Sequence, residues 1–177
     1  MSTAAVPAPA EVPAWPAEVP AGAAFLDLEV RADGSLRVGA MVSGGQPWVF
    51  TGEHLSQVEQ VVPRVAVLAG HNVRRFDVPQ LERLIGIPFP ADLDVRVVDT
   101  LELASLVFPG EPSQALDKLY REGSSLSDPV QDCLESLQVL ARCVRALPGV
   151  PGLVRSVARR LLPPSATRDL THILQFR

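Results

Sequence analysis

The chain has 177 residues, is 47% hydrophobic and carries a net charge of −4, which suits one compact domain with a buried core. No apolar run approaches the roughly 20 residues that cross a bilayer, and no basic residue precedes an apolar stretch near the N-terminus. We therefore expect a cytoplasmic protein without membrane contact. The two cysteines, Cys133 and Cys143, stand about 15 Å apart along one predicted helix, beyond the reach of a disulfide.

The two ends of the chain differ in composition from the middle. Residues 1–22 are rich in alanine and contain five prolines, which predicts a disordered leader because proline fixes φ and removes donors. Residues 23–147 form the predicted domain. Residues 148–177 are predicted to form a basic helix and a C-terminal tail or linker. Seven arginines and a single acid lie within residues 142–177, a pattern that suits either phosphate contacts or packing on an acidic neighbour.

Strands are predicted first, followed by strands and helices in alternation, which favours an α/β domain with a mixed sheet. The predicted strands are 23–30, 36–42, 47–50, 65–69 and 95–98, the fourth of them parallel. Helices are predicted at 53–62, ended by Pro63, then from the region of Phe76 to Ile85, at 100–107, at 113–120 and from Ser127 to Val144, with a basic helix at 153–162.

Asp27 and Glu29 lie two residues apart on the apolar strand AAFLDLEV, so both side chains project from the same face. Two buried acids on one face are costly without a positive partner, and a divalent cation accepts such oxygen ligands. The alternative is an edge strand whose acids are solvated.

Two further acids follow along the chain. Asp77 ends the segment HNVRRFD, just after the fourth predicted strand, and Asp132 lies in the first turns of the long amphipathic helix. Acids at strand ends and helix starts can converge on one pair of metal ions.

The strand motif FLDLE, the segment HNVRRFD and the late Asp132, in this order, resemble the DEDD superfamily of 3′–5′ exonucleases. This superfamily includes the DnaQ-like proofreading exonucleases and ribonuclease T. The resemblance covers roughly residues 23–147. The segment Val98-Asp99-Thr100, with the leucine-rich helix after it, also looks like the region that these proteins carry between their second and third motifs.

The resemblance implies a ribonuclease H-like fold, a mixed five-stranded sheet flanked by helices. It also implies two Mg²⁺ or Mn²⁺ ions, with Asp27 bridging both and Glu29, Asp77 and Asp132 completing the ligand set. The implied activity is hydrolysis of phosphodiester bonds at the 3′ end of single-stranded DNA or RNA. Residues that could touch the terminal nucleotide are Leu28, Val30, Asn72 and Phe76. For Leu28 and Phe76, a place in the core is an equally good interpretation.

The general base of the family is missing from its expected positions. The histidine branch has His five residues before the last Asp, where this chain has Ser127, and the tyrosine branch has Tyr four residues before it, where this chain has Asp128. A serine hydroxyl is not basic near pH 7, and an Asp with a pKa of about 3.9 is a weak base. Ser127 as a helix cap and Asp128 in the first turn suit a structural role.

Three explanations stay open. The enzyme works slowly without the base, at a cost of about 10²–10⁴-fold; another residue, His54 or His172, supplies it; or catalysis is lost and nucleic-acid binding is retained. In the last case the domain serves a larger DNA-processing protein, with a helicase or polymerase in the same chain or in a partner. His71, inside the HNVRRFD segment, is interpreted as structural or substrate-adjacent.

Overall fold

A mixed five-stranded sheet forms the centre of the computed structural model, which describes residues 14–86, 96–111, 116 and 128–161. The strand order is β3-β2-β1-β4-β5. The strands are β1 (Ala23–Val30), β2 (Leu36–Ser43), β3 (Gln46–Phe50), β4 (Val67–Gly70) and β5 (Arg96–Asp99). This confirms the predicted fold class, and each strand lies within two residues of its predicted bounds.

The strands on the two sides of β1 differ in their orientation. β2 and β3 form an antiparallel meander on one side, whereas β4 and β5 run parallel to β1 on the other. The strand order therefore reverses beside β1. In open α/β sheets, ligands bind beyond the carboxyl ends of the strands at such a point.

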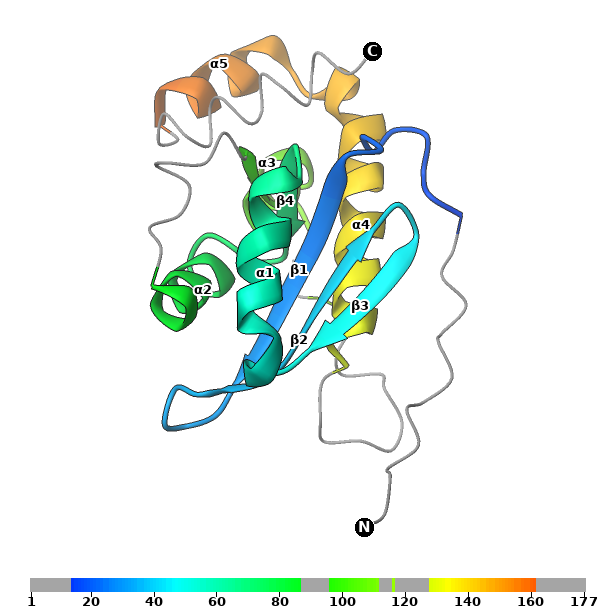
Figure 1. The fold of residues 1–177 in the computed structure, drawn as a ribbon. Coiled ribbons are helices and arrows are strands. Elements are labelled where there is room, and N and C mark those ends of the chain that lie inside the picture. The colour runs from blue at the N-terminus through cyan, green and yellow to red at the C-terminus, as the bar shows by residue number, and fades with distance from the viewer. Residues whose placement is uncertain (1–13, 87–95, 112–115, 117–127, 162–177) are drawn as a thin grey trace.

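Helices cover both faces of the sheet (Figure 1). The helical elements are η1 (Gly52–His54), α1 (Leu55–Val61), η2 (Val62–Arg64), α2 (Asp77–Ile85), α3 (Thr100–Val107), α4 (Pro129–Ala146), η4 (Leu147–Gly149) and α5 (Gly152–Leu161). α3 and α4 pack with Ala23 and Phe25 of β1 in one core cluster. α1 and α2 pack with Ala24, Leu26 and Leu28 in the other. No helix among the described residues is long and apolar enough to cross a membrane.

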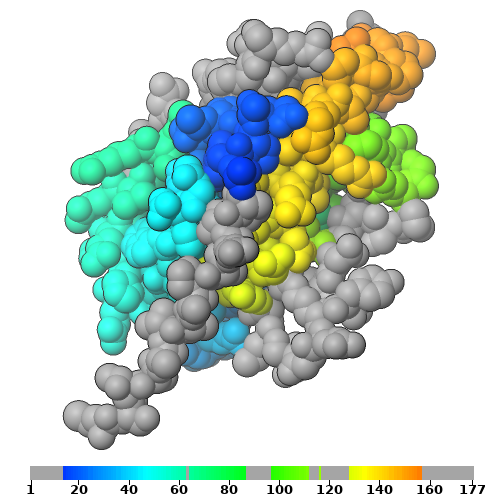
Figure 2. All heavy atoms as spheres, turned by 90° about the vertical axis from the view of Figure 1, so that its right-hand side faces the viewer, coloured from blue at the N-terminus to red at the C-terminus, as the bar shows by residue number. Residues whose placement is uncertain are grey.

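The segment before β1 joins the core, although residues 1–22 were predicted to form a disordered leader. The Trp15 ring meets Phe25 edge-on at 5.9 Å between centroids, and its Nε1 donates to the carbonyl of Val19 at 3.1 Å. Val19 is 4% exposed. Figure 2 shows this dark blue segment seated against α4, in yellow. A tryptophan and a valine among the prolines bury enough apolar surface to hold the segment. Residues 1–13 lie outside the described part.

The start of α4 differs from the prediction. Asp128, not Ser127, is the N-cap of α4, because its side chain accepts from the Val130 and Gln131 N–H groups and Pro129 occupies the first turn. Proline is favoured there since its missing N–H is not needed. The first helix ends within one residue of its prediction: α1 ends at Val61, and Pro63 lies in the short η2 that follows it. Ser127 and the predicted helix 113–120 lie outside the described residues.

Candidate metal centre

Three of the four predicted acids converge on the α4 face of β1. Asp27 and Glu29 follow Phe25 at alternate positions, so their side chains project toward α4. Asp132, in the first turn of α4, is completely buried. One carboxylate oxygen from each of Asp27, Glu29 and Asp132 lies within 4.8 Å of the other two. Three hard oxygen donors at this spacing can bind one divalent cation.

Cys133 connects α4 to strands β1 and β2. Its buried thiol donates toward the carbonyl oxygens of Phe25, at 3.3 Å, and Ala40, at 3.5 Å. Both cysteines are free, as predicted, and both are buried. Burial raises the pKa of the Cys133 thiol well above its usual value, and the charges of Asp27, Asp77 and Asp132 raise it further. The thiol therefore stays protonated close to these three carboxylates.

Asp77 approaches the same place from the other side but is not one of the three acids that gather. It is the first residue of α2, is 2% exposed, and accepts a hydrogen bond from the backbone N–H of Leu28 at 2.8 Å. Leu28 lies between Asp27 and Glu29 on β1. Asp77 is thus hydrogen-bonded to the backbone of β1 that carries Asp27 and Glu29.

The short length of β4 explains this contact. β4 pairs with β1 only from Ala23 to Phe25 and ends at Gly70, where a Cβ would stand 2.6 Å from the carbonyl oxygen of Leu26. The β4-facing edge of β1 therefore has no strand partner beyond this point. The Leu28 N–H, two residues further along the same edge, is satisfied by the Asp77 carboxylate instead.

Burial and charge repulsion together perturb the pKa of Asp77. Burial, and then the charge of Asp27, raise the pKa of Asp77 to about 8, against the opposing effect of the hydrogen bond from Leu28. A buried carboxylate beside another carboxylate is stabilised by a cation. The donor set therefore fits a divalent cation in both its ligand type and its charge.

The predicted nucleotide contacts have different surroundings. Leu28 is 2% exposed and packs in the core, whereas Phe76 is 38% exposed. Val30 and Asn72 are partly exposed, and Asn72 has the left-handed φ of 64°. The core interpretation therefore holds for the Leu28 side chain, and the Phe76 ring remains available at the surface.

The histidines of the described residues have structural partners. The Thr100 hydroxyl donates to the Gly70 carbonyl at 3.2 Å, so it accepts from Nδ1 of His71 at 3.1 Å. His54 lies at the start of α1, and its Nδ1 accepts from the Thr51 N–H at 3.3 Å. His172 lies outside the described residues.

Comparison with solved structures identifies the architecture. The chain is similar to NrnC of Brucella melitensis bound to pGG, with a TM-score of 0.55 and 19% identity over 85% of each chain. The fold is ribonuclease H-like. At this identity the similarity establishes the fold alone. No protein-family model matches the sequence, and no curated protein matches it.

The ribonuclease H-like fold contains one buried acid whose importance the sequence did not reveal. Asp99, at the end of β5, is 4% exposed and accepts hydrogen bonds from four backbone N–H groups. The sequence placed Asp99 before a predicted helix, which indicates a helix cap, and in a segment that resembles the exonucleases, but neither signal predicts its bonds to Asn72 and Arg74.

The raised pKa of Asp77 predicts a pH dependence of stability in metal-free protein. In the unfolded chain an aspartate ionises near pH 3.9, whereas the folded chain holds the proton to about pH 8. The folded state therefore binds more protons between these values, and the free energy of unfolding falls as pH rises through this range. In urea titrations with EDTA at pH 5 to 8, wild type should lose stability relative to Asp77→Asn, which retains an acceptor for Leu28. If the free energy of unfolding of the two proteins changed with pH in parallel, the raised pKa of Asp77 would be contradicted. Asp33→Asn, at an exposed turn, is the control.

Proposed function

We propose that the chain is a metal-dependent 3′–5′ exonuclease that hydrolyses phosphodiester bonds at the 3′ end of single-stranded nucleic acid. The observation that carries this proposal is the gathering of Asp27, Glu29 and Asp132 within 4.8 Å. It occurs on β1, where the strand order of a ribonuclease H-like sheet reverses. Asp77 joins the set through Leu28.

Asp27, Glu29, Asp77 and Asp132 would hold two divalent cations, Mg²⁺ or Mn²⁺. When bound, such a pair lowers the pKa of a water molecule and offsets the charge on the leaving 3′ oxygen. The protein contributes the positions of the oxygens: Asp27 and Glu29 are fixed by the pleat of β1, and Asp132 by the docking of α4 through Cys133. A site assembled on a strand and a helix start is rigid, which suits in-line displacement.

The substrate side of the proposal rests on Phe76 and Asn72. Phe76 precedes Asp77 directly and exposes 38% of its surface, and an aromatic face stacks on any base with about 1–3 kcal/mol per base. Asn72 lies with Phe76 in the loop between β4 and α2. The pGG ligand of the NrnC structure supports a nucleic-acid ligand for this fold. The proposed substrate is therefore a single-stranded DNA or RNA end whose last base stacks on Phe76.

A 5′-labelled single strand, incubated with the protein and Mn²⁺, should shorten stepwise from its 3′ end. Asp27→Asn should reduce the rate at least about 100-fold, because it removes the charge of a central ligand. Asp33→Asn makes the same chemical change at the exposed turn between β1 and β2 and should leave the rate unchanged. An intact strand with wild type, or equal shortening with Asp27→Asn, would refute the exonuclease proposal.

A second candidate function is a binding module with exonuclease architecture and without turnover, part of a larger helicase- or polymerase-associated protein. Asp128 favours it, because this carboxylate accepts from the Val130 and Gln131 N–H groups at 3.0 and 3.4 Å. At the position where the tyrosine branch carries its base, the chain therefore has a helix cap. Ser127, at the other position, has no useful basicity.

Ser127→His distinguishes the two functions. If the chain is an exonuclease that lacks only its base, this substitution should raise kcat about 10²–10⁴-fold in the single-strand assay. A binding module should retain affinity for the strand and stay inert after the substitution. Ser56→His, at an exposed position of α1, is the matched control and should leave both turnover and affinity unchanged.

A further inference from the structure

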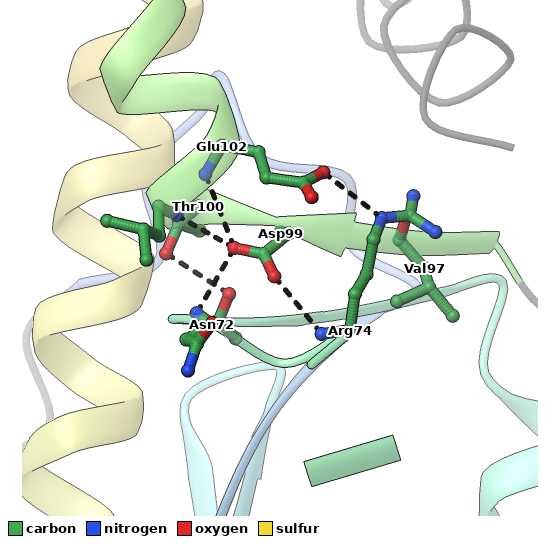
Figure 3. Close-up of polar contacts among 8 residues, drawn as sticks. Asn72, Arg74, Val97, Asp99, Thr100 and Glu102 are labelled. Carbon is green, nitrogen blue, oxygen red and sulfur yellow. Dashed lines mark hydrogen bonds and ion pairs between the residues drawn. The ribbon is translucent and has the colours of Figure 1, made fainter. Parts of the chain in front are cut away.

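The Asp99 carboxylate joins two parts of the chain that are distant in sequence. Oδ1 accepts from the N–H groups of Leu101 and Glu102, at 3.0 and 3.4 Å, and so caps α3. Oδ1 also accepts from the Asn72 N–H at 3.1 Å, and Oδ2 accepts from the Arg74 N–H at 3.1 Å. Figure 3 shows the carboxylate between the start of α3 and the chain at Asn72 and Arg74. A helix cap needs only the first two bonds, so the other two serve a different purpose.

The contacted segment is the β4–α2 loop, residues 71–76, and β5 and α3 hold it at three further points. The imidazole of His71 bonds to the Thr100 hydroxyl. The Arg74 guanidinium donates to the Val97 carbonyl and lies 3.5 Å from Glu102 in an ion pair (Figure 3). Asp99 is the contact that fixes the loop backbone itself, at two of its six residues.

The loop leads directly into Asp77. Asn72, in its left-handed conformation, accepts from the N–H groups of Arg75 and Phe76 at 3.2 and 3.0 Å, and the Val78 N–H donates to Val73 at 2.9 Å. These bonds form one compact turn. A displacement at Asn72 or Arg74 is therefore passed on to Asp77, whose carboxylate must lie 2.8 Å from the Leu28 N–H.

We propose that Asp99 is a positioning residue of the candidate metal centre. It holds the β4–α2 loop in the conformation in which Asp77 reaches β1, and this part of the inference stands on the hydrogen bonds alone. The bonds from the Asn72 and Arg74 N–H groups to Asp99 are here called the Asp99 clamp. Its consequence for cation binding rests on the proposed function: loss of the Asp99 clamp should weaken the affinity for Mn²⁺ without the removal of any ligand.

Two substitutions separate the clamp from the helix cap. Asn and Ser are both good N-caps, so Asp99→Asn and Asp99→Ser should keep the first turn of α3. Each offers a single acceptor atom in place of two carboxylate oxygens, so it lacks the second oxygen that accepts from the Arg74 N–H and holds this part of the loop. In amide hydrogen exchange, the Arg74 and Leu28 amides should exchange at least about 10-fold faster than in wild type, whereas Glu102 changes little. Unchanged exchange at Leu28 in both variants would overturn the proposal.

Mn²⁺ titration by calorimetry provides the second readout. Both Asp99 variants should bind Mn²⁺ about 10–100-fold more weakly, the usual effect of losing a residue behind a ligand. Val62→Ala is the control for stability: Val62 is 1% exposed and belongs to the core cluster of α1 and α2, so the variant loses stability but should keep its Mn²⁺ affinity. An equal loss of affinity in Val62→Ala would reduce the role of Asp99 to stability and overturn the proposal.

The two proposals fail in different ways. If wild type does not bind Mn²⁺, the exonuclease proposal fails, and the positioning role is still decided by the exchange of the Leu28 amide. If wild type binds Mn²⁺ and the Asp99 variants bind it equally well, the positioning role fails and the exonuclease proposal stands.

Discussion

The hydrogen bond between the Leu28 N–H and the Asp77 carboxylate joins the parts of the candidate site. It exists because β4 ends at Gly70 while β1 continues, so the edge of β1 is left with a donor that another group must satisfy. A carboxylate from the start of α2 fills that place and is held close to Asp27. Because Leu28 separates Asp27 from Glu29, the same bond fixes the backbone that carries both of these acids.

This arrangement places several negatively charged carboxylates close together, and their repulsion indicates the kind of ligand. Burial and Asp27 raise the pKa of Asp77 to about 8, and the fully buried Asp132 enters the same region from α4. Structural packing alone does not favour several carboxylates around one point. A divalent cation converts this repulsion into attraction. The docking of Cys133 on β1 and β2 and the Asp99 clamp on the β4–α2 loop are then two supports for one charged centre.

The apolar run AAFLDLEV predicted β1 with its observed bounds, and the spacing of two residues predicted the shared face of Asp27 and Glu29, because both are local properties of the chain. Contacts between distant residues were less accessible. The packing of Trp15 on Phe25 was hidden by the surrounding prolines. The bond from Leu28 to Asp77 spans 49 residues, and no pattern shows that β4 pairs with β1 only as far as Phe25. Asp99 was recognisable as a helix cap, whereas its bonds to the loop depend on the parallel pairing of β4 with β5.

The central claim is that the acids on β1 and α4 form a cation site, and Mn²⁺-soaked crystals test it most directly. Anomalous scattering should show two Mn²⁺ ions roughly 3.5–4 Å apart, bound by carboxylate oxygens of Asp27, Glu29 and Asp132, with Asp77 contributing to the same centre. Crystals that take up Mn²⁺ elsewhere, with no anomalous peak among these carboxylates, would contradict the claim.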